Sequence, residues 1–296
     1  MKAISTQQRV IEPTRLKADV GNTMPSATHQ TLNRTHRVLI LGGTSEAAQL
    51  AARLSERTDL IVISSLAGRV EKPVLPAGII RTGGFGGVPG LIEYLLKQSI
   101  EVVIDATHPF AAKISSNAEL ACRQTKTSLI AFERPAWRPQ QGDDWVQVAD
   151  VESAALLVDK PKNRVFLSVG RQELNRFSEC RNAWFLIRTI DKPTVPLPHN
   201  SKLILNRGPF RLHDERLLLQ QEAITHIVSK NSGGEATYAK IEAARELGIE
   251  VILVDRPVIP RATVCTHLDE VYLRLEELLA GQPARKVEPA EETTSL

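Results

Sequence analysis

The feature that most restricts the fold is a short apolar segment followed by a glycine turn and a helix-forming run. Residues 37–41 are Arg-Val-Leu-Ile-Leu, a pattern typical of a buried parallel strand. Gly42 and Gly43 follow directly, and an Ala- and Leu-rich run covers residues 47–54. A strand, a glycine turn and a helix in this order predict the first unit of a parallel α/β sheet.

The same alternation continues along the first half of the chain. Further strands are expected at 60–63, 79–80, 102–104 and 129–131, with helices over 89–97 and up to about residue 124. Ligands of parallel α/β sheets bind at the carboxyl ends of the strands. Every glycine-rich or unusual polar segment of this half falls at such an end, so these loops are the candidate functional residues.

The second half repeats the plan of the first. Residues 165–173 align with 38–46, and Asp255-Arg256-Pro257 repeats Glu133-Arg134-Pro135. This order predicts an internal duplication: an α/β fold of two similar Rossmann-like lobes with mainly parallel sheets and a cleft between them. The expected boundaries are a disordered extension at 1–36, a dinucleotide-binding lobe at 37–140, a second lobe on the substrate side at 141–280, and a disordered tail at 281–296.

Charge and composition argue against several classes of function. The formal net charge is +3, but residues 1–36 alone hold five basic and two acidic side chains, so the rest of the chain is near neutral. A nucleic-acid footprint needs a basic face on the folded part. No apolar stretch of 18 residues occurs, so we expect no membrane span. The three cysteines are far apart in the sequence: Cys122, Cys180 and Cys265. This spacing argues against disulfides and against a metal site, and it favours a reducing cytoplasm.

The turn at residues 42–46 is the first candidate site. Glycines let the backbone approach a pyrophosphate, and the start of the helix supplies N–H groups and the positive end of the helix dipole. The candidate cofactor-binding residues here are Gly42, Gly43, Thr44, Ser45 and Glu46. The alternative is an ordinary strand-to-helix turn with a Ser or Thr cap. The turn lacks the Lys-Ser/Thr ending of a P-loop, which argues against nucleotide hydrolysis.

The end of the second strand bears on the choice of cofactor. An NAD site usually places Asp or Glu there for the ribose hydroxyls. This chain offers Ser64, Ser65 and Arg69, and hydroxyls with a guanidinium suit a 2′-phosphate. We therefore expect NADPH, with NADH possible. The alternative is that Arg69 is an ordinary surface arginine.

Two further loops of the first half carry candidate residues. Gly83 and Gly84 open a run with four glycines in five residues, which suits either a ligand cradle or a flexible lid. Thr107 is a candidate cofactor contact, and His108 beside it is a candidate for donating a hydrogen bond or a proton. The alternative for His108 is a residue that only caps the turn.

The equivalent loop of the second half contains Lys230, Ser232 and Gly233. Lys230 can neutralise a carboxylate, and the glycine allows close approach. Arg134 and Arg256 also lie near predicted strand ends. Basic side chains gathered at one edge predict a polyanionic substrate.

Together these segments resemble the precorrin-6A reductases, including the cobalt-precorrin-6A branch. The matching segments, in order, are ILGGTSEA (40–47), AGR (67–69), RTGGFGG (81–87), IDATHPFA (104–111), ERP.W (133–137) and VSKNSGGEAT (228–237). The resemblance implies a soluble enzyme that reduces one double bond of a corrin precursor with a nicotinamide cofactor, using no metal of its own. It also implies possible handover of the tetrapyrrole-derived macrocycle to other enzymes of the corrin pathway.

The resemblance also suggests roles for the candidate residues. The many carboxylates of a corrin precursor would account for Arg134, Arg256 and Lys230, with Ser232 and Gly233 in the same substrate loop. His108 and Lys230 are candidate proton donors, and solvent is a third. Two other readings stay open: another NADPH-dependent oxidoreductase or epimerase, and a non-catalytic nucleotide-sensing module. The cobalt content of the substrate, the oligomeric state and the role of residues 1–36 are not decided by the sequence.

Overall fold

The computed structural model describes residues 35–68, 75–259 and 264–281. These residues form two six-stranded sheets, and every strand pairing within them is parallel. The expected α/β fold with two mainly parallel sheets is therefore confirmed. A cleft between the lobes stays a prediction, as do the disordered ends, which lie almost wholly outside the described residues.

The first sheet has the strand order β12-β5-β4-β1-β2-β3. Its strands are β1 (His36–Leu41), β2 (Leu60–Leu66), β3 (Ile79–Thr82), β4 (Val102–Asp105), β5 (Ser128–Phe132) and β12 (Val264–Cys265). Its helices are α1 (Ser45–Ser55), α2 (Gly87–Lys97), α3 (Ala112–Thr125) and α7 (Leu268–Ala280). The strand order reverses between β1 and β4, so the carboxyl ends of these two strands form the topological switch point at which such sheets bind ligands.

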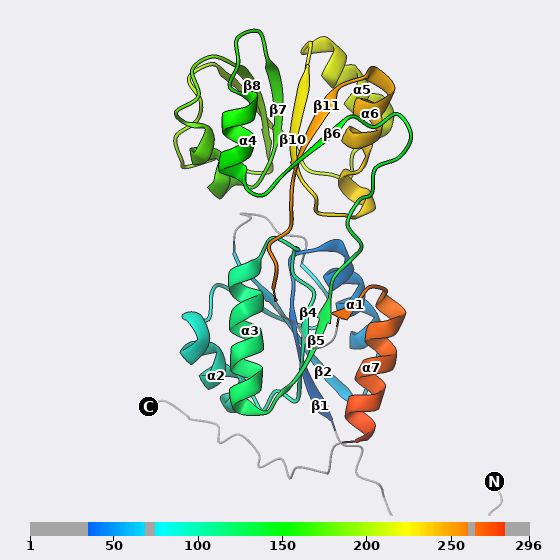
Figure 1. Cartoon of the computed structure of the whole chain (residues 1–296). Helices are drawn as coiled ribbons and strands as arrows, with labels where there is room; N and C mark the ends of the chain where they lie inside the picture. The colour runs from blue at the N-terminus through cyan, green and yellow to red at the C-terminus, as the bar shows by residue number, and fades with distance from the viewer. Residues whose placement is uncertain (1–34, 69–74, 260–263, 282–296) are drawn as a thin grey trace, which may run out of the picture. The chain divides into compact units, whose positions relative to one another are not determined.

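Alternation along β1 explains why helices cover both faces of this sheet. Val38 and Ile40 belong to one core cluster, with side chains of α1 and α7, while Leu39 and Leu41 belong to another, with side chains of α2 and α3. Successive side chains of a strand point to opposite faces. A strand apolar at every position therefore needs a helical layer on each side, and Figure 1 shows α1 and α7 on one face and α2 and α3 on the other.

The second sheet has the order β6-β11-β10-β7-β8-β9. Its strands are β6 (Trp145–Val148), β7 (Arg164–Ser168), β8 (Trp184–Thr189), β9 (Ser201–Leu205), β10 (His226–Lys230) and β11 (Glu250–Val254). Its helices are α4 (Val151–Val158), α5 (Leu212–Gln221) and α6 (Ala239–Leu247), with the 3-10 helices η1 (Arg171–Phe177) and η2 (Glu235–Thr237). Central β7 lies between β8 and β10 as β1 lies between β2 and β4, so the lobes are similar, as the duplication predicts.

The chain crosses between the two sheets twice, after β5 and after β11. The strand that follows each crossing, β6 or β12, forms one edge of the sheet that it joins. β6 follows β5 in sequence but pairs with β11, whereas β12 follows β11 and pairs with β5. The assignment of residues up to 280 to the second lobe is therefore wrong, because β12 and α7 belong to the first. The amphipathic pattern of residues 268–279 predicts a helix with one buried face, but it carries no information on which sheet that face covers.

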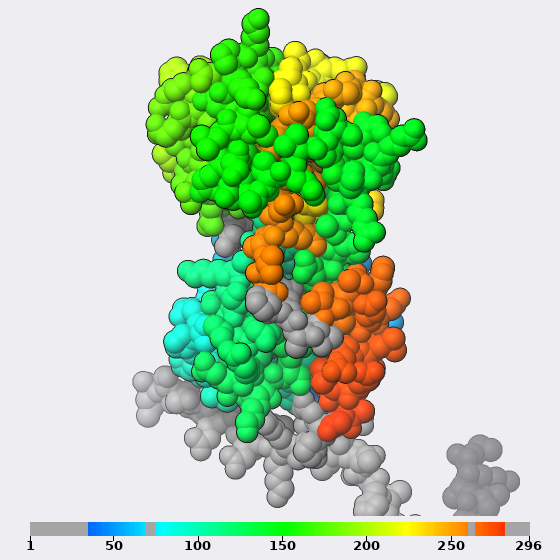
Figure 2. All heavy atoms as spheres, in the orientation of Figure 1, coloured from blue at the N-terminus to red at the C-terminus, as the bar shows by residue number. Residues whose placement is uncertain are grey.

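The packing of α7 confirms this placement. Val271 and Leu275 are fully buried in the same cluster as Val38, Ile40 and Leu50. Figure 2 shows this placement by colour, because the orange-red atoms of the last described helix lie beside green atoms from the first half of the chain. No helix within the described ranges combines the length and apolar character that a bilayer crossing requires.

Replacement of Leu275 by Ala tests the docking of α7. Leu275 is fully buried, so its truncation leaves a cavity in the first-lobe core and should lower the free energy of unfolding by about 2–5 kcal/mol. Leu273→Ala on the same helix is the matched control, because Leu273 is 67% exposed and its loss should cost less than about 0.5 kcal/mol. Urea unfolding followed by circular dichroism measures both. Equal effects of the two substitutions would contradict the assignment of α7 to the first core.

Candidate functional site

The turn after β1 is held by the hydroxyl of Thr44. Its Oγ1 accepts a hydrogen bond from the Ala47 amide at 3.1 Å and donates one to the Ala106 carbonyl at 2.8 Å. Thr44 is thus the N-cap of α1, and it also ties the turn to the loop after β4. The Ser45 hydroxyl lies 2.9 Å from Glu46 Oε2. Both hydroxyls therefore have protein partners, and Thr44 has the capping role of an ordinary strand-to-helix turn. The backbone of the turn remains the candidate phosphate contact.

The glycines of two turns leave open space above the backbone. Gly43 and Gly83 both have φ of +108°, which strongly favours glycine. A Cβ at Gly43, Gly83 or Gly84 would meet no heavy atom within 4 Å. A Cβ at Gly42, in contrast, would lie 3.4 Å from the Ala47 side chain. A ligand can therefore approach the main chain at Gly43 and at the Gly83-Gly84 turn, which lie at the carboxyl ends of β1 and β3.

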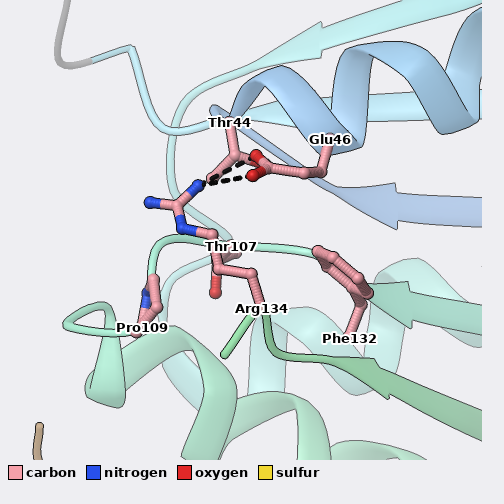
Figure 3. A pocket seen from close by; sticks show the side chains of 6 residues that line it. All are labelled: Thr44, Glu46, Thr107, Pro109, Phe132 and Arg134. Atoms are coloured by element: carbon pink, nitrogen blue, oxygen red, sulfur yellow. Dashed lines mark hydrogen bonds and ion pairs between the residues drawn. The ribbon is translucent and has the colours of Figure 1, made fainter. Parts of the chain in front are cut away.

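A small pocket lies at the carboxyl ends of β1, β4 and β5 (Figure 3). Its lining residues are Thr44, Glu46, Thr107, Pro109, Phe132 and Arg134. The Thr107 side chain is held by the last residue of β4, because its hydroxyl donates a hydrogen bond to Asp105 Oδ1 at 2.7 Å. The structure thus places the predicted cofactor residues Thr44, Glu46 and Thr107 beside the predicted substrate residue Arg134.

Arg134 is the basic group of this pocket. Its Nη1 donates to both carboxylate oxygens of Glu46 at 2.9 Å, and its Nε donates to the Ser232 carbonyl at 2.8 Å. Figure 3 shows Glu46 reaching from the first turn of α1 toward this guanidinium. Burial raises the pKa of Glu46, but the Arg134 charge and the hydrogen bonds outweigh it, so the pKa lies below its usual value. Arg134 therefore joins the α1 turn to the predicted substrate loop.

Arg256 links the two chain crossings. Its Nη1 donates to Glu133 Oε1 at 2.9 Å and to the Arg134 carbonyl at 2.8 Å, and its Nε donates to the Asn231 carbonyl at 2.7 Å. Gly233 lies against the same segment, since a Cβ there would be 2.1 Å from the Pro135 carbonyl oxygen. These contacts give Arg256 and Gly233 a structural task; a contact with substrate stays a prediction.

Lys230 is paired with a carboxylate that the sequence does not single out as its partner. Its Nζ lies 2.7 Å from both carboxylate oxygens of Glu173, and it lies 4.6 Å from the centre of the Phe110 ring. Glu173 also accepts a hydrogen bond from the Gly170 amide at 3.0 Å. The ammonium is therefore held in place and its charge is partly balanced. Glu173 and Lys230 are 57 positions apart in the sequence, so no local signal marks this pair.

His108 lies in the loop that follows β4. Its Nδ1 accepts a hydrogen bond from the Phe110 amide at 3.2 Å. Burial and then the charges of Lys230, Arg134, Arg256 and Lys240 lower the pKa of His108 to about 3. The imidazole is therefore neutral near pH 7, which weakens the prediction that it supplies a proton and leaves the hydrogen-bonding and capping interpretations open.

The region around Ser65 contains a basic residue that was not predicted. Arg69 lies outside the described residues, whereas Arg81, which pairs with Ser65 in the β2–β3 register, donates to Ser65 Oγ at 3.1 Å. It also donates to the carbonyls of Gly83 and Gly84 at 2.6 Å and stacks on Phe85 at 3.6 Å. The signal in the sequence is an arginine two residues before a glycine run at a strand end.

Arg81 is a cation with no carboxylate partner among the residues that the structure describes. Burial lowers the pKa of its guanidinium, because removal from water disfavours the charged form. Ser64 precedes Ser65 on β2 and pairs with Ile80, so its side chain points to the opposite face of the sheet from Arg81. It is 2% exposed, and its hydroxyl has no hydrogen-bond partner among the described residues. A guanidinium without a carboxylate partner at the carboxyl end of β3, next to the Ser65 hydroxyl, suits an anionic ligand.

The fold and the open glycine turns define a two-lobed Rossmann-like protein with its candidate site at the switch point of the first sheet. The family model described as Precorrin-6x reductase CbiJ/CobK matches residues 37–276. The chain therefore belongs to this family, and it is an oxidoreductase of the corrin branch of biosynthesis that acts on a carbon–carbon bond.

Similar proteins agree with this assignment. A "Precorrin-6A reductase" of Rhodococcus erythropolis is 47% identical over 77% of this chain and 92% of its own length. A "Cobalt-precorrin-6A reductase" of Priestia megaterium is 28% identical over 79% of this chain and 96% of its own. The solved structure titled "CobK precorrin-6A reductase" is 44% identical, has a TM-score of 0.78, and covers 82% of this chain and 97% of that one.

Replacement of His108 by Gln tests the neutral state of the imidazole. In the unfolded chain His108 binds a proton below its ordinary pKa near 6.5, whereas in the folded chain it does so only near pH 3. Its contribution to stability is thus present above about pH 6.5 and is lost as the pH falls toward 3, by up to about 1.4 kcal/mol per pH unit. The variant should lose stability less steeply than the wild type over this range.

Denaturant unfolding at several pH values between 7 and 4 measures this difference. His199→Gln is the matched control, because His199 is exposed, and it removes one histidine without touching the site. Parallel pH profiles of the wild type and the His108→Gln protein would contradict a neutral His108.

Proposed function

We propose that this chain reduces one double bond of precorrin-6A with NADPH as the electron donor. The observation that carries the proposal is the open main chain at Gly43, at the switch point of a chain that belongs to the precorrin-6x reductase family. Sequence identity to the relatives supports the cobalt-free substrate. This chain is 47% identical to a protein named for precorrin-6A and 28% identical to a protein named for the cobalt form.

The residues present fit a dinucleotide at the first sheet. The Gly43 main chain and the start of α1 would bind the diphosphate, and Thr44 keeps this turn in shape by capping the helix and bonding to Ala106. Arg81 and Ser65 would bind a 2′-phosphate, because no protein carboxylate within the described ranges balances Arg81. NADPH, when bound, would supply a hydride to the conjugated macrocycle.

The basic side chains around His108 suit the other reactant. A corrin precursor carries several acetate and propionate groups, and Lys230, Arg134 and Arg256 all raise the positive potential at the loop after β4. The chain's main contribution to the reduction would be alignment of the two reactants. The proton that completes it would come from solvent or from the Lys230 ammonium. We also propose a cytoplasmic location and handover of the product to a later enzyme of the corrin pathway.

Anaerobic incubation with precorrin-6A and NADPH tests the function directly. We expect the near-ultraviolet absorbance of the reduced nicotinamide to fall together with a change in the macrocycle spectrum, and a slower reaction with the cobalt form. NADPH binding without change in either spectrum would favour a nucleotide-sensing module, and turnover of other substrates alone would favour a different oxidoreductase. Absence of NADPH binding would remove the basis of the proposal.

Replacement of Arg81 by Gln tests the choice of cofactor. Loss of a charge-assisted contact to the 2′-phosphate should raise the KM for NADPH about tenfold or more, with little change for NADH, which lacks that phosphate. Steady-state kinetics with both cofactors measures this ratio. Arg123→Gln, at an exposed position of α3, is the control. Similar losses for both cofactors would show that Arg81 only supports the glycine turn.

A further inference from the structure

The hydrogen bond between Phe110 and His108 fixes the tautomer of the imidazole. A backbone N–H can only donate, so His108 Nδ1, which lies 3.2 Å from the Phe110 nitrogen, must carry a lone pair. The ring proton of the neutral imidazole then lies on Nε2. The loop that follows β4 therefore presents an N–H donor of fixed identity, set by its own backbone.

Basic side chains from four separate segments act on this ring. Lys230 from β10, Arg134 from the segment after β5, Arg256 from the segment after β11 and Lys240 from α6 all act on His108 with positive charge. Three carboxylates pair with these cations: Glu173 with Lys230, Glu46 with Arg134 and Glu133 with Arg256. Phe110 is close to both groups, with its ring centre 5.8 Å from that of His108 and 4.6 Å from Lys230 Nζ.

We propose that His108 positions the substrate as a neutral Nε2–H donor to one of its carboxylates, beside the Lys230 ammonium, and does not act as the proton donor of the reduction. This inference rests on the proposed function. A neutral donor flanked by cations suits a carboxylate, because the anion gains a hydrogen bond and an attractive field without a change of protonation.

The alternative role as an acid meets two obstacles. Transfer of the Nε2 proton from a neutral imidazole would leave an imidazolate, which is far too basic to form near neutral pH. Formation of the imidazolium would add a positive charge near Lys230, Arg134 and Arg256 and would break the hydrogen bond from the Phe110 amide, which needs the Nδ1 lone pair. The depressed pKa of His108 agrees with this reasoning.

Nuclear magnetic resonance of the full-length protein with 15N-labelled histidine tests the state of the ring. The His108 signals are assigned by their loss in His108→Gln. We expect an unprotonated Nδ1 and a protonated Nε2, with no titration between pH 8 and 5, and a shift of the Nε2–H signal when precorrin-6A is added without cofactor. A protonated Nδ1, a titration in this range, or no shift on addition of the macrocycle would overturn the proposal.

Kinetics of two substitutions separate positioning from proton donation. The glutamine amide of His108→Gln keeps an N–H donor but has no acid function, so the KM for the macrocycle should stay within about threefold of the wild type. His108→Ala removes the donor and should raise this KM about tenfold or more, with kcat changed by less than about threefold. Equal losses of kcat in both variants would identify an acid, and an unchanged KM in His108→Ala would exclude the contact.

The two measurements fail in different ways. If the wild-type protein reduced no macrocycle, the proposed function would be wrong. The resonance measurement would still show whether the His108 ring is neutral and whether its Nε2–H signal shifts when the macrocycle binds. His199→Gln controls for the loss of one histidine in both experiments, because it lies at an exposed position on the second lobe.

Discussion

The parallel pairing of β1 between β2 and β4 is the constraint on which the candidate site depends. Because β1 is buried on both faces, the chain must leave it through a turn at the edge of the sheet and return along a helix. That turn becomes Gly42-Gly43-Thr44, and the equivalent exit from β4 becomes the loop that carries Thr107 and His108. The hydroxyl of Thr44 joins these two exits through Ala106. A single packing requirement thus brings the predicted cofactor and substrate residues to one edge.

The local part of this arrangement could be predicted from the sequence, and the long-range part could not. Strands, glycine turns and the duplication depend on periodicity and on residues with special backbone freedom, which short segments carry in themselves. The partner of Lys230 lies 57 residues away, and nothing local marks Glu173 as its counter-ion. The role of Arg81 is not predictable for a related reason, since its proximity to Ser65 comes from strand register and not from sequence distance. The neutral state of His108 likewise depends first on burial and then on cations from four separate segments, which together lower its pKa.

The Glu-Arg-Pro and Asp-Arg-Pro segments show how duplicated residues diverge. Arg134 engages the first-turn glutamate of α1, whereas its counterpart Arg256 engages the first crossing, and the glutamate equivalent to Glu46 is held by Lys230. Residues at equivalent positions of the two halves therefore have different partners. In the first lobe the pairing leaves the Gly43 main chain open, while in the second Glu173 covers the Gly170 amide with its own carboxylate. This difference supports the proposal that the dinucleotide binds at the first lobe.

The reciprocal placement of β6 and β12 has a topological consequence. Each half of the sequence gives its last strand and helix, β6 with α4 and β12 with α7, to the sheet built by the other half. The chain thus has the connectivity of an intertwined homodimer whose two copies have been fused end to end. Each repeat therefore obtains one edge strand and one helix of its sheet from the other repeat. The repeat visible in the sequence and the lobe visible in space are therefore different objects, offset by one strand and one helix.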